Sequence, residues 1–219
     1  MVKRRTYWED EGFSKSYQPG PQKHRLYILG KLKELGVVKL LDVGCGTGVI
    51  YELIADSEEG RWDNIQKYKG VDYSWQMVKT ARQLFPYGHF EIQDARNLLE
   101  PDSSWDCVLL MHCLDHLDNY KAAIAEAVRV SKKYICICNW NPFVKEGTVL
   151  NSRNDLGKKK DAQGNLLPGE ELWEDTHLQY YSRDVLIEEF DKYKLIDVDI
   201  AEIPDDYSKY NFIWILKKP

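Results

Sequence analysis

The residues from Leu40 to Gly48 combine a carboxylate with three glycines at alternate positions. Asp42 lies two residues before Gly44, and Gly46 and Gly48 complete the pattern D-x-G-x-G-x-G. Because glycine lacks a Cβ atom, such a loop can adopt unusual φ values and lets a ligand lie against the backbone. The acidic side chain suits a ligand with an ammonium or sulfonium group and disfavours a diphosphate. The predicted chemistry is therefore the binding of a cationic, nucleotide-like ligand.

The positions of these glycines separate several classes of nucleotide-binding loop. A dinucleotide-binding loop reads G-x-G-x-x-G, and its last glycine would fall where this chain has Val49. A phosphate-binding P-loop would end in Gly-Lys-Ser/Thr, and the loop does not. An NAD-dependent oxidoreductase remains an alternative. So does a tight turn without a ligand, although three glycines destabilise a plain turn.

Three aspartates follow three successive predicted strands. Asp42 belongs to the glycine loop, and Asp72 and Asp94 end the next two strands. Since parallel strands present their carboxyl ends at one edge of a sheet, the three groups are expected to face one ligand. Asp72 is predicted to accept hydrogen bonds from two ribose hydroxyls. It lies 28 residues after Gly44 (72 − 44), more than the usual distance of about 20, which we attribute to the hydrophilic stretch 56–66.

The glycine loop with its leading aspartate resembles that of class I S-adenosylmethionine-dependent methyltransferases, in particular their small-molecule branch. The resemblance covers residues 38–140 motif by motif and the rest in the order of elements. It implies a Rossmann-like fold, S-adenosylmethionine as the cofactor, and methyl transfer to an oxygen, nitrogen or carbon atom of a small molecule. It also implies that Asp94 accepts from the adenine amino group while the Ala95 amide meets the ring. Tyr73 and Met77 would lie against ribose and adenine. The cofactor-binding residues implied are Asp42, Gly44, Cys45, Gly46, Thr47, Gly48, Asp72, Tyr73, Met77, Asp94, Ala95, Met111 and His112.

Two histidines follow the strand predicted at 105–111, where this family places residues that face the methyl group. His112 and His116 are candidate general bases because imidazole titrates near neutral pH. The alternative is that His112 packs beside the cofactor and that His116 caps the next segment. A metal site with Asp115 lacks a further ligand set in the sequence, so no metal is predicted.

Aromatic and polar residues outside these motifs are candidates for the acceptor side of the site. The segments 1–20 and 141–181 are expected to supply its variable walls, which makes the acceptor itself hard to predict. Packing in the core is the alternative for each aromatic side chain. The candidate substrate-binding residues are Tyr17, Trp140, His177, Tyr180 and Tyr181.

Alternating strands and helices predict the α/β class, with a doubly wound, mostly parallel sheet; the resemblance implies seven strands. Strands are expected at 38–43, up to 72, 90–93, 105–111, 134–140, 195–203 and about 211–216. Helices are expected from Pro21 to Gly36, from about Thr47, and after caps at Ser74, at Asp118 or Asn119, and at Ser182. The short link between the last two strands requires a hairpin, so the C-terminal strand is predicted to be antiparallel.

The chain of 219 residues is predicted to form one domain, with an N-terminal helical lid at 1–36 and a substrate-side insert at 141–181. Its 30 basic and 35 acidic residues give a net charge of −5, which disfavours nucleic acid and anionic membranes as partners.

No apolar run reaches the length of a membrane span, and we expect no signal peptide. The five cysteines include no C-x-x-C pair and are expected to be reduced, so a cytoplasmic location is predicted. A tRNA or protein methyltransferase and a non-catalytic S-adenosylmethionine-binding regulatory subunit remain alternatives, and no oligomeric state is predicted.

Overall fold

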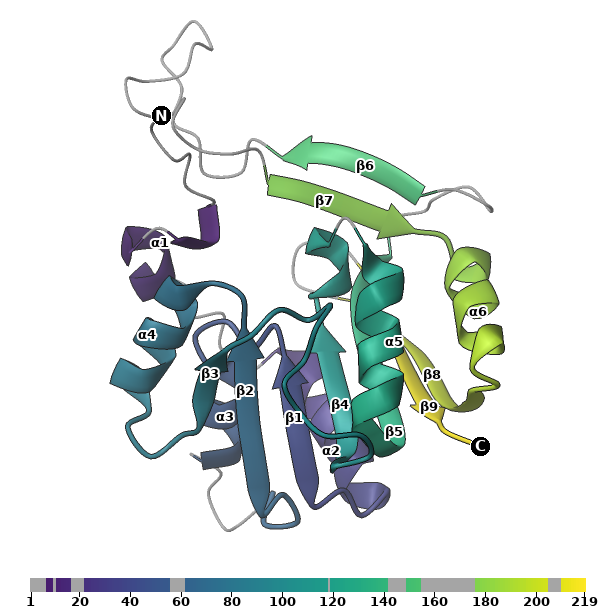
Figure 1. The fold of residues 1–219 in the computed structure, drawn as a ribbon, viewed down its shortest axis with the longest axis horizontal. Coiled ribbons are helices and arrows are strands. Elements are labelled where there is room, and N and C mark those ends of the chain that lie inside the picture. Colours follow the sequence, from purple (N-terminus) through teal and green to yellow (C-terminus); the bar gives the residue numbers. More distant parts are fainter. Residues whose placement is uncertain are drawn as a thin grey trace, which may run out of the picture.

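The structure is a computed structural model that describes residues 7–9, 11–16, 22–55, 62–117, 119–141, 149–154, 176–204 and 210–219. Its centre is one sheet of seven strands in the order β3-β2-β1-β4-β5-β9-β8 (Figure 1). The strands are β1 (Lys39–Val43), β2 (Lys67–Asp72), β3 (Phe90–Ile92), β4 (Trp105–Met111), β5 (Ser131–Asn141), β8 (Ile196–Pro204) and β9 (Tyr210–Lys217). The prediction of a doubly wound, mostly parallel sheet is confirmed.

The strand order reverses beside β1. From β1 the chain moves outward through β2 to β3, and it then returns to place β4 on the other side of β1, with all of these pairs parallel. This reversal creates the crevice at the carboxyl ends of parallel strands where α/β folds bind ligands. At the other end of the sheet, β9 runs antiparallel to both β5 and β8, as the short connection predicted.

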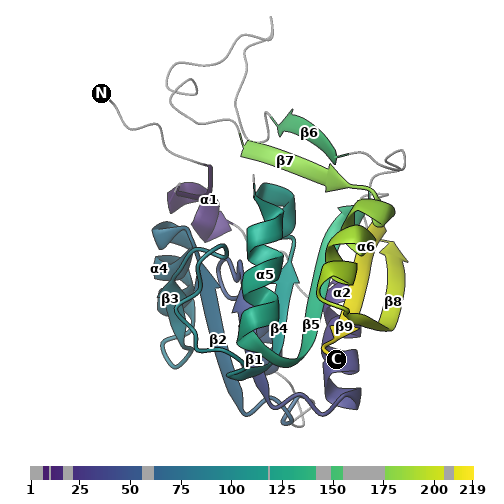
Figure 2. The same ribbon diagram turned by 45° about the vertical axis from the view of Figure 1, so that its right-hand side comes forward.

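Helices cover both faces of the sheet, because neighbouring residues of a buried strand point to opposite sides. Leu41 packs in a core with residues of α5 and α6, whereas Leu40 packs in a second core with residues of α2, α3 and α4. Figures 1 and 2 show α5 and α6 on one side of the sheet and α2 on the other. The helices are α2 (Lys23–Glu34), α3 (Val49–Ala55), α4 (Trp75–Leu84), α5 (Tyr120–Val130) and α6 (Arg183–Lys192).

The predicted helix caps have different outcomes. The Ser74 hydroxyl accepts a hydrogen bond from the Met77 amide, and the Asn119 side chain accepts from the Ala122 amide, so both cap their helices. Ser182 occupies the N-cap position of α6, as predicted, but its side chain makes no capping hydrogen bond. The Ser182 side chain is buried instead of turning back toward the amides of the first turn.

Several boundaries also differ from prediction. Thr47 lies in the glycine loop, because α3 begins at Val49, and β5 begins at Ser131, before the expected start. Pro21 and Asp118 lie outside the described residues. Helix α2 buries Ile28 and its neighbours against the sheet, so this part of the predicted lid 1–36 is a layer of the core. The division into one domain with a lid and an insert otherwise stays a prediction.

The segment after β5 contains a separate two-stranded antiparallel sheet, formed by β6 (Val149–Asn154) and β7 (Thr176–Tyr181). It lies beyond the carboxyl ends of the parallel strands (Figures 1 and 2). Part of the predicted insert is therefore an antiparallel pair of strands on the side of the sheet where the parallel strands end. Among the helices that the structure describes, none is both long and apolar enough to cross a membrane.

Candidate functional site

The glycine loop between β1 and α3 has the backbone that its sequence predicts. Gly44, Gly46 and Gly48 all have positive φ, at 79°, 55° and 87°. A Cβ atom on Gly44 would lie 2.9 Å from the Cβ of Cys113, and one on Gly48 would lie 2.9 Å from the ring of Phe90. Glycine is therefore required here both by conformation and by close packing.

Asp72 joins the end of β2 to this loop. Its Oδ2 accepts a hydrogen bond from the Gly46 amide at 2.9 Å, and its Oδ1 accepts from the Ser74 amide at 2.8 Å. Burial raises the pKa of Asp72, while these two amides oppose the rise. A carboxylate has about four acceptor positions, so Asp72 retains capacity for hydroxyl donors of a ligand. The structure thus brings Asp72 to the glycine loop, as predicted.

Asp42 points into the protein rather than along the open side of the loop. Its side chain is 1% exposed, and its Oδ2 accepts a hydrogen bond from the Tyr68 hydroxyl at 2.7 Å. Its Oδ1 has no hydrogen-bond partner among the described residues. Burial raises the pKa of Asp42 to about 7, although the Tyr68 hydrogen bond and the positive charge of Arg25 act in the opposite direction. The role of Asp42 in ligand binding stays a prediction.

Asp94 is held by a residue that the sequence analysis missed. Arg96 donates to its carboxylate from the backbone amide at 2.9 Å and from Nη2 at 2.8 Å, and this interaction lowers the pKa of Asp94. The D-x-R spacing was a signal that could have revealed the pair. Ala95 is buried beside it. A ligand amino group must therefore share the Asp94 carboxylate with Arg96.

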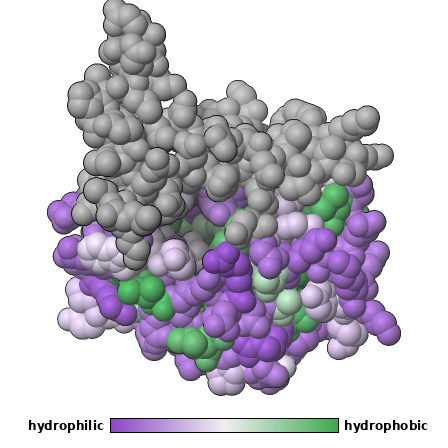
Figure 3. All heavy atoms as spheres, turned by 45° about the horizontal axis from the view of Figure 1, so that its top comes forward, coloured by the Kyte–Doolittle hydropathy of each residue, from purple (hydrophilic) through white to green (hydrophobic). Residues whose placement is uncertain are grey.

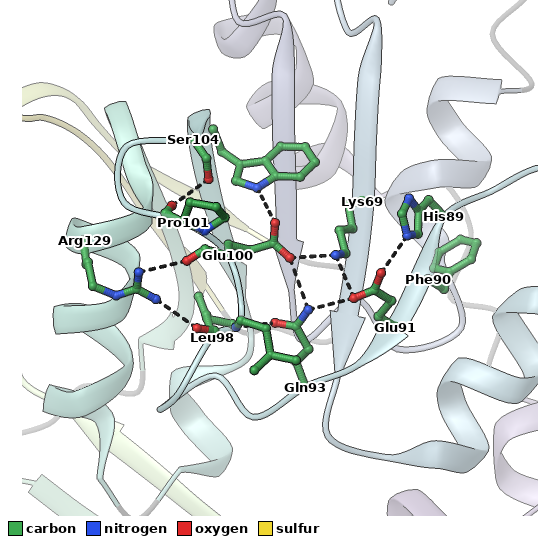
Figure 4. A network of polar contacts seen from close by, with 12 residues as sticks. Lys69, His89, Phe90, Glu91, Gln93, Leu98, Glu100, Pro101, Ser104 and Arg129 are labelled. Carbon is green, nitrogen blue, oxygen red and sulfur yellow. Dashed lines mark hydrogen bonds and ion pairs between the residues drawn. The ribbon is translucent and has the colours of Figure 1, made fainter.

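A buried polar network holds the segment that carries Asp94 (Figure 4). Lys69 of β2 contacts Glu91 and Glu100, each at 2.7 Å, and the Gln93 amide donates to both carboxylates. Glu100 also accepts from the indole of Trp105 at 2.9 Å. The hydrogen bond from Lys69 holds the pKa of Glu91 at about 2, against the effect of burial. These contacts fix both ends of the segment 93–100.

The N-terminal segments η1 (Tyr7–Glu9) and α1 (Glu11–Ser16) lie against α4. The Ser74 hydroxyl donates to the Trp8 carbonyl at 2.6 Å, and the hydroxyls of Ser14 and Thr80 are 3.0 Å apart. Of the two residues predicted to flank the nucleoside, Met77 is only 1% exposed, whereas Tyr73 is 66% exposed. Of these two side chains, Tyr73 is therefore the one that is exposed to a ligand in this conformation.

His112 and His116 lie together at the end of β4, and η3 (Leu114–His116) carries the second. The His112 ring stacks on Trp140 with the ring centroids 4.6 Å apart, and the His116 ring meets Trp140 edge-on at 5.8 Å. His24 of α2 contacts the His112 ring at 5.4 Å, and Trp8 contacts the His116 ring at 4.9 Å. The predicted base candidates and Trp140 thus form one cluster of rings.

The remaining candidates for substrate binding have different positions. Tyr181 is 2% exposed, and its hydroxyl donates to the Leu114 carbonyl at 2.9 Å, so it attaches β7 to η3 rather than facing an open site. Tyr17 lies outside the described residues, as do the side chains of His177 and Tyr180, whose backbones belong to β7. Their roles stay predictions.

The described residues contain no group of three or more His, Cys, Asp or Glu side chains placed to hold a metal ion. All five cysteines are free, and burial raises the pKa of the Cys113 thiol and of the other four. Viewed from the end that carries β6 and β7, the described surface is largely hydrophilic with separate apolar patches (Figure 3).

Comparisons with known proteins agree with this arrangement. Residues 41–134 match the family model of a methyltransferase domain. Over these residues the chain therefore resembles a methyltransferase domain. The domain is 35% identical over 98 residues to ajmaline N-methyltransferase of Rauvolfia serpentina, covering 42% of this chain and 32% of that enzyme. It is 30% identical over 96 residues to the ubiquinone/menaquinone biosynthesis C-methyltransferase UbiE of Campylobacter jejuni, covering 44% and 41%. The chain thus spans less than half the length of these relatives.

The fold of the methyltransferase domain is shared with solved structures at low sequence identity. Magnesium protoporphyrin IX methyltransferase from Synechocystis PCC 6803, solved with S-adenosylhomocysteine, superposes with a TM-score of 0.66 at 17% identity, covering 97% of each chain. The 1,6-didemethyltoxoflavin-N1-methyltransferase of Burkholderia thailandensis gives a TM-score of 0.62 at 15% identity, covering 96% of this chain and 80% of that one.

Proposed function

We propose that the protein is an enzyme that transfers the methyl group of S-adenosylmethionine to an oxygen, nitrogen or carbon atom of a small molecule. The observation that carries this proposal is the contact between Asp72 and the Gly46 amide. It joins a positive-φ glycine loop to a carboxylate at the switch point of the sheet, where one ligand can meet both. The family match over 41–134 supports the same reading.

The residues present fit a nucleoside with a cationic end. The positive-φ glycines let the loop pass close to Cys113 and Phe90, and Asp72 beside the loop has acceptor capacity for ribose hydroxyls. Asp94 would accept a hydrogen bond from the adenine amino group, the Ala95 amide would contact the adenine ring, and Tyr73 would pack against the ribose. When bound, the cofactor supplies a methyl group that its sulfonium has already activated. The protein therefore has to position the acceptor atom and, for acceptors that carry a proton, remove it.

His112 and His116 are the proposed proton acceptors, and His112 is the stronger candidate. It follows β4 directly, and its backbone amide donates to the Cys138 carbonyl at 2.7 Å, which fixes its position against β5. The stacked Trp140 ring fixes the plane of the imidazole. A base held in one orientation contributes more to proton removal than a mobile one.

A small-molecule acceptor is supported by the named relatives. They methylate at nitrogen, carbon or oxygen, and one structural neighbour was solved with the heterocycle 1,6-didemethyltoxoflavin. We propose that the acceptor lies between the cluster of rings and the β6–β7 pair, and that His177 and Tyr180 contribute to binding it. The net charge of −5 disfavours nucleic acid, and we propose a cytoplasmic location without a membrane partner.

Calorimetry with the full chain tests the cofactor. We expect S-adenosylhomocysteine to bind and NAD to leave no signal. Asp72→Asn should weaken binding about 10–100-fold, because a hydrogen bond to a charged group contributes about 1.5–3 kcal/mol. The matched control is Asp197→Asn, an exposed aspartate of β8 at the far edge of the sheet, which should bind as the wild type does. Binding of NAD instead of S-adenosylhomocysteine would contradict the proposal.

Catalysis needs its own experiment. Incubation of the protein with tritiated S-adenosylmethionine and a metabolite extract should yield a labelled small molecule, and Asp72→Asn should abolish most of the label. Cofactor binding with no labelled product from any extract would favour a non-catalytic regulatory subunit. Label on tRNA or protein would correct the acceptor class.

A further inference from the structure

Asp115 is a fully buried carboxylate beside the proposed base. It is 0% exposed, in η3, three residues after His112. Its Oδ2 accepts a hydrogen bond from the Trp140 amide at 3.3 Å and lies 3.6 Å from Nδ1 of His112. Its Oδ1 has no hydrogen-bond partner among the described residues. A carboxylate thus stands in the interior, aimed at an imidazole nitrogen.

A buried carboxylate such as Asp115 lowers the stability of the fold. Removing a carboxylate from water costs several kcal/mol unless hydrogen bonds or an opposite charge compensate. One amide at 3.3 Å offsets only part of that cost. Burial raises the pKa of Asp115 to about 7, with the charge of His116 and the Trp140 amide opposing the rise. Nδ1 of His112, 3.6 Å from Oδ2, is the imidazole nitrogen placed to donate to this carboxylate after a small movement of either side chain.

The His112 ring is held so that its two nitrogens have different surroundings. Nδ1 is buried on the side of Asp115, and Nε2 lies 3.9 Å from the Cys138 sulfur, a weak partner. His112 also has a positive φ of 52°, which is unusual for a residue other than glycine. The surrounding contacts therefore hold a backbone conformation that turns this ring between Asp115 and Trp140.

We propose that Asp115 is the positioning residue of His112. It accepts a hydrogen bond from Nδ1–H, which fixes the tautomer and leaves the Nε2 lone pair to take a proton from the methyl acceptor. The proton that the acceptor atom loses is then bound at Nε2. The resulting imidazolium charge is balanced by the Asp115 carboxylate until the proton passes to solvent. This inference rests on the proposed methyl transfer for its consequence in catalysis, but not for the pairing itself.

Other titratable groups around His112 set the balance of charge. His116 and Asp115 approach from η3, the Cys138 thiol from β5, and His24 from α2. Arg25 of α2 adds a positive charge on the Cys138 side. Among these groups Asp115 is the acid on the Nδ1 side of the ring, so its carboxylate stabilises a positive charge on the His112 imidazole.

Nitrogen-15 NMR of the imidazole side chains tests the pairing without any substrate. His112→Gln assigns the signal, and His89→Gln is the matched control because that histidine is exposed and pairs with Glu91 instead. We expect wild-type His112 to carry its proton on Nδ1 when neutral. In Asp115→Asn its proton affinity should fall at least tenfold, as expected for loss of an adjacent opposite charge. A proton on Nε2 in the wild type, or an unchanged affinity in Asp115→Asn, would overturn the proposal.

Two further measurements separate this proposal from the proposed function. In the methyl-transfer assay with the metabolite extract, Asp115→Asn should lower kcat about 10–100-fold and displace the pH profile, with S-adenosylhomocysteine affinity unchanged. A merely structural role would move the thermal midpoint but not the pH profile. If the wild type binds no S-adenosylhomocysteine, the proposed function fails, while the NMR result still decides the pairing. If Asp115→Asn does not fold, the wild-type tautomer alone decides it.

Discussion

Two parts of the candidate site satisfy their polar groups in different ways. The adenosine side, formed by the glycine loop, Asp72 and residues 91–100, pairs the charges of Asp72, Asp94 and the Lys69 network with each other and with backbone amides, whereas Asp42, buried behind the loop, keeps one oxygen without a partner among the described residues. The acceptor side, formed by residues 112–117, Trp140 and Tyr181, consists of stacked rings around one buried carboxylate with an unpaired oxygen. Under the proposed function, the first side holds the cofactor in one position, whereas the second presents the proposed base to the methyl acceptor.

The strongest test of this difference removes the proposed base. His112→Gln should lower methyl transfer about 10²–10⁴-fold, the range expected for loss of a general base. The affinity for S-adenosylhomocysteine should fall far less, because the adenosine side is intact. Single-turnover transfer and calorimetry on the same preparation measure both. If both quantities fall equally, the two sides do not act separately.

The second test breaks the adenosine side. Lys69→Met leaves Glu91 and Glu100 without their common cation, and the free energy of unfolding should fall by about 3 kcal/mol, as for a broken buried pair. Denaturant unfolding measures this loss. The control, Lys31→Met, removes a surface pair with Glu34 and should cost no more than about 0.5 kcal/mol. Equal losses in the two variants would show that the network is not specially stabilising.

The third test uses two glycines. Gly44→Ala places a Cβ atom at positive φ and 2.9 Å from Cys113, so we expect a loss of about 1–3 kcal/mol in stability and little S-adenosylhomocysteine binding. Gly30→Ala in α2 is its counterpart, because nothing lies within 4 Å of the added atom. Helix propensity predicts that it stabilises the fold by about 0.5–1 kcal/mol. If Gly44→Ala binds S-adenosylhomocysteine as tightly as the wild type does, the glycine loop is not part of the cofactor site.

The smallest expected effect is on acid stability. Lys69 holds the pKa of Glu91 at about 2, below its ordinary value of 4.5. The stabilisation is therefore complete above pH 4.5 and is lost as the pH falls toward 2. Because Glu91 is more than a third exposed, the change should not exceed about 1 kcal/mol. Unfolding curves of wild type and Glu91→Gln between pH 5 and 2 should converge at the acid end, and parallel curves would contradict this assignment.

Local sequence patterns predicted the fold and the approach of Asp72 to the glycine loop. Strand and helix periodicity, the glycine spacing and the short link before β9 are properties of neighbouring residues, and the structure confirms the sheet and its antiparallel strand. Asp72 reached the loop because strand ends in a parallel sheet meet at one edge. Whether the predicted residues bind the cofactor is a separate question that the proposed experiments address.

The directions in which the side chains of the site point could not be predicted from the sequence. The turning of Asp42 toward Tyr68 and the network between Lys69 and Glu100 depend on packing between strands far apart in the chain. The positive φ of His112, which directs its ring toward Asp115, has no signature in residue type. The absence of a capping hydrogen bond from Ser182 likewise has no signature in residue type, because Ser74, equally buried, does cap its helix.

The hydroxyl of Tyr181 fastens the strand β7 to the turn that carries Asp115 and His116. Since this anchor sits at the C-terminal end of β7, the chain between β6 and β7 can grow or shrink at little entropic cost without releasing it. A change in the length of that connection would therefore leave the geometry around the two histidines the same.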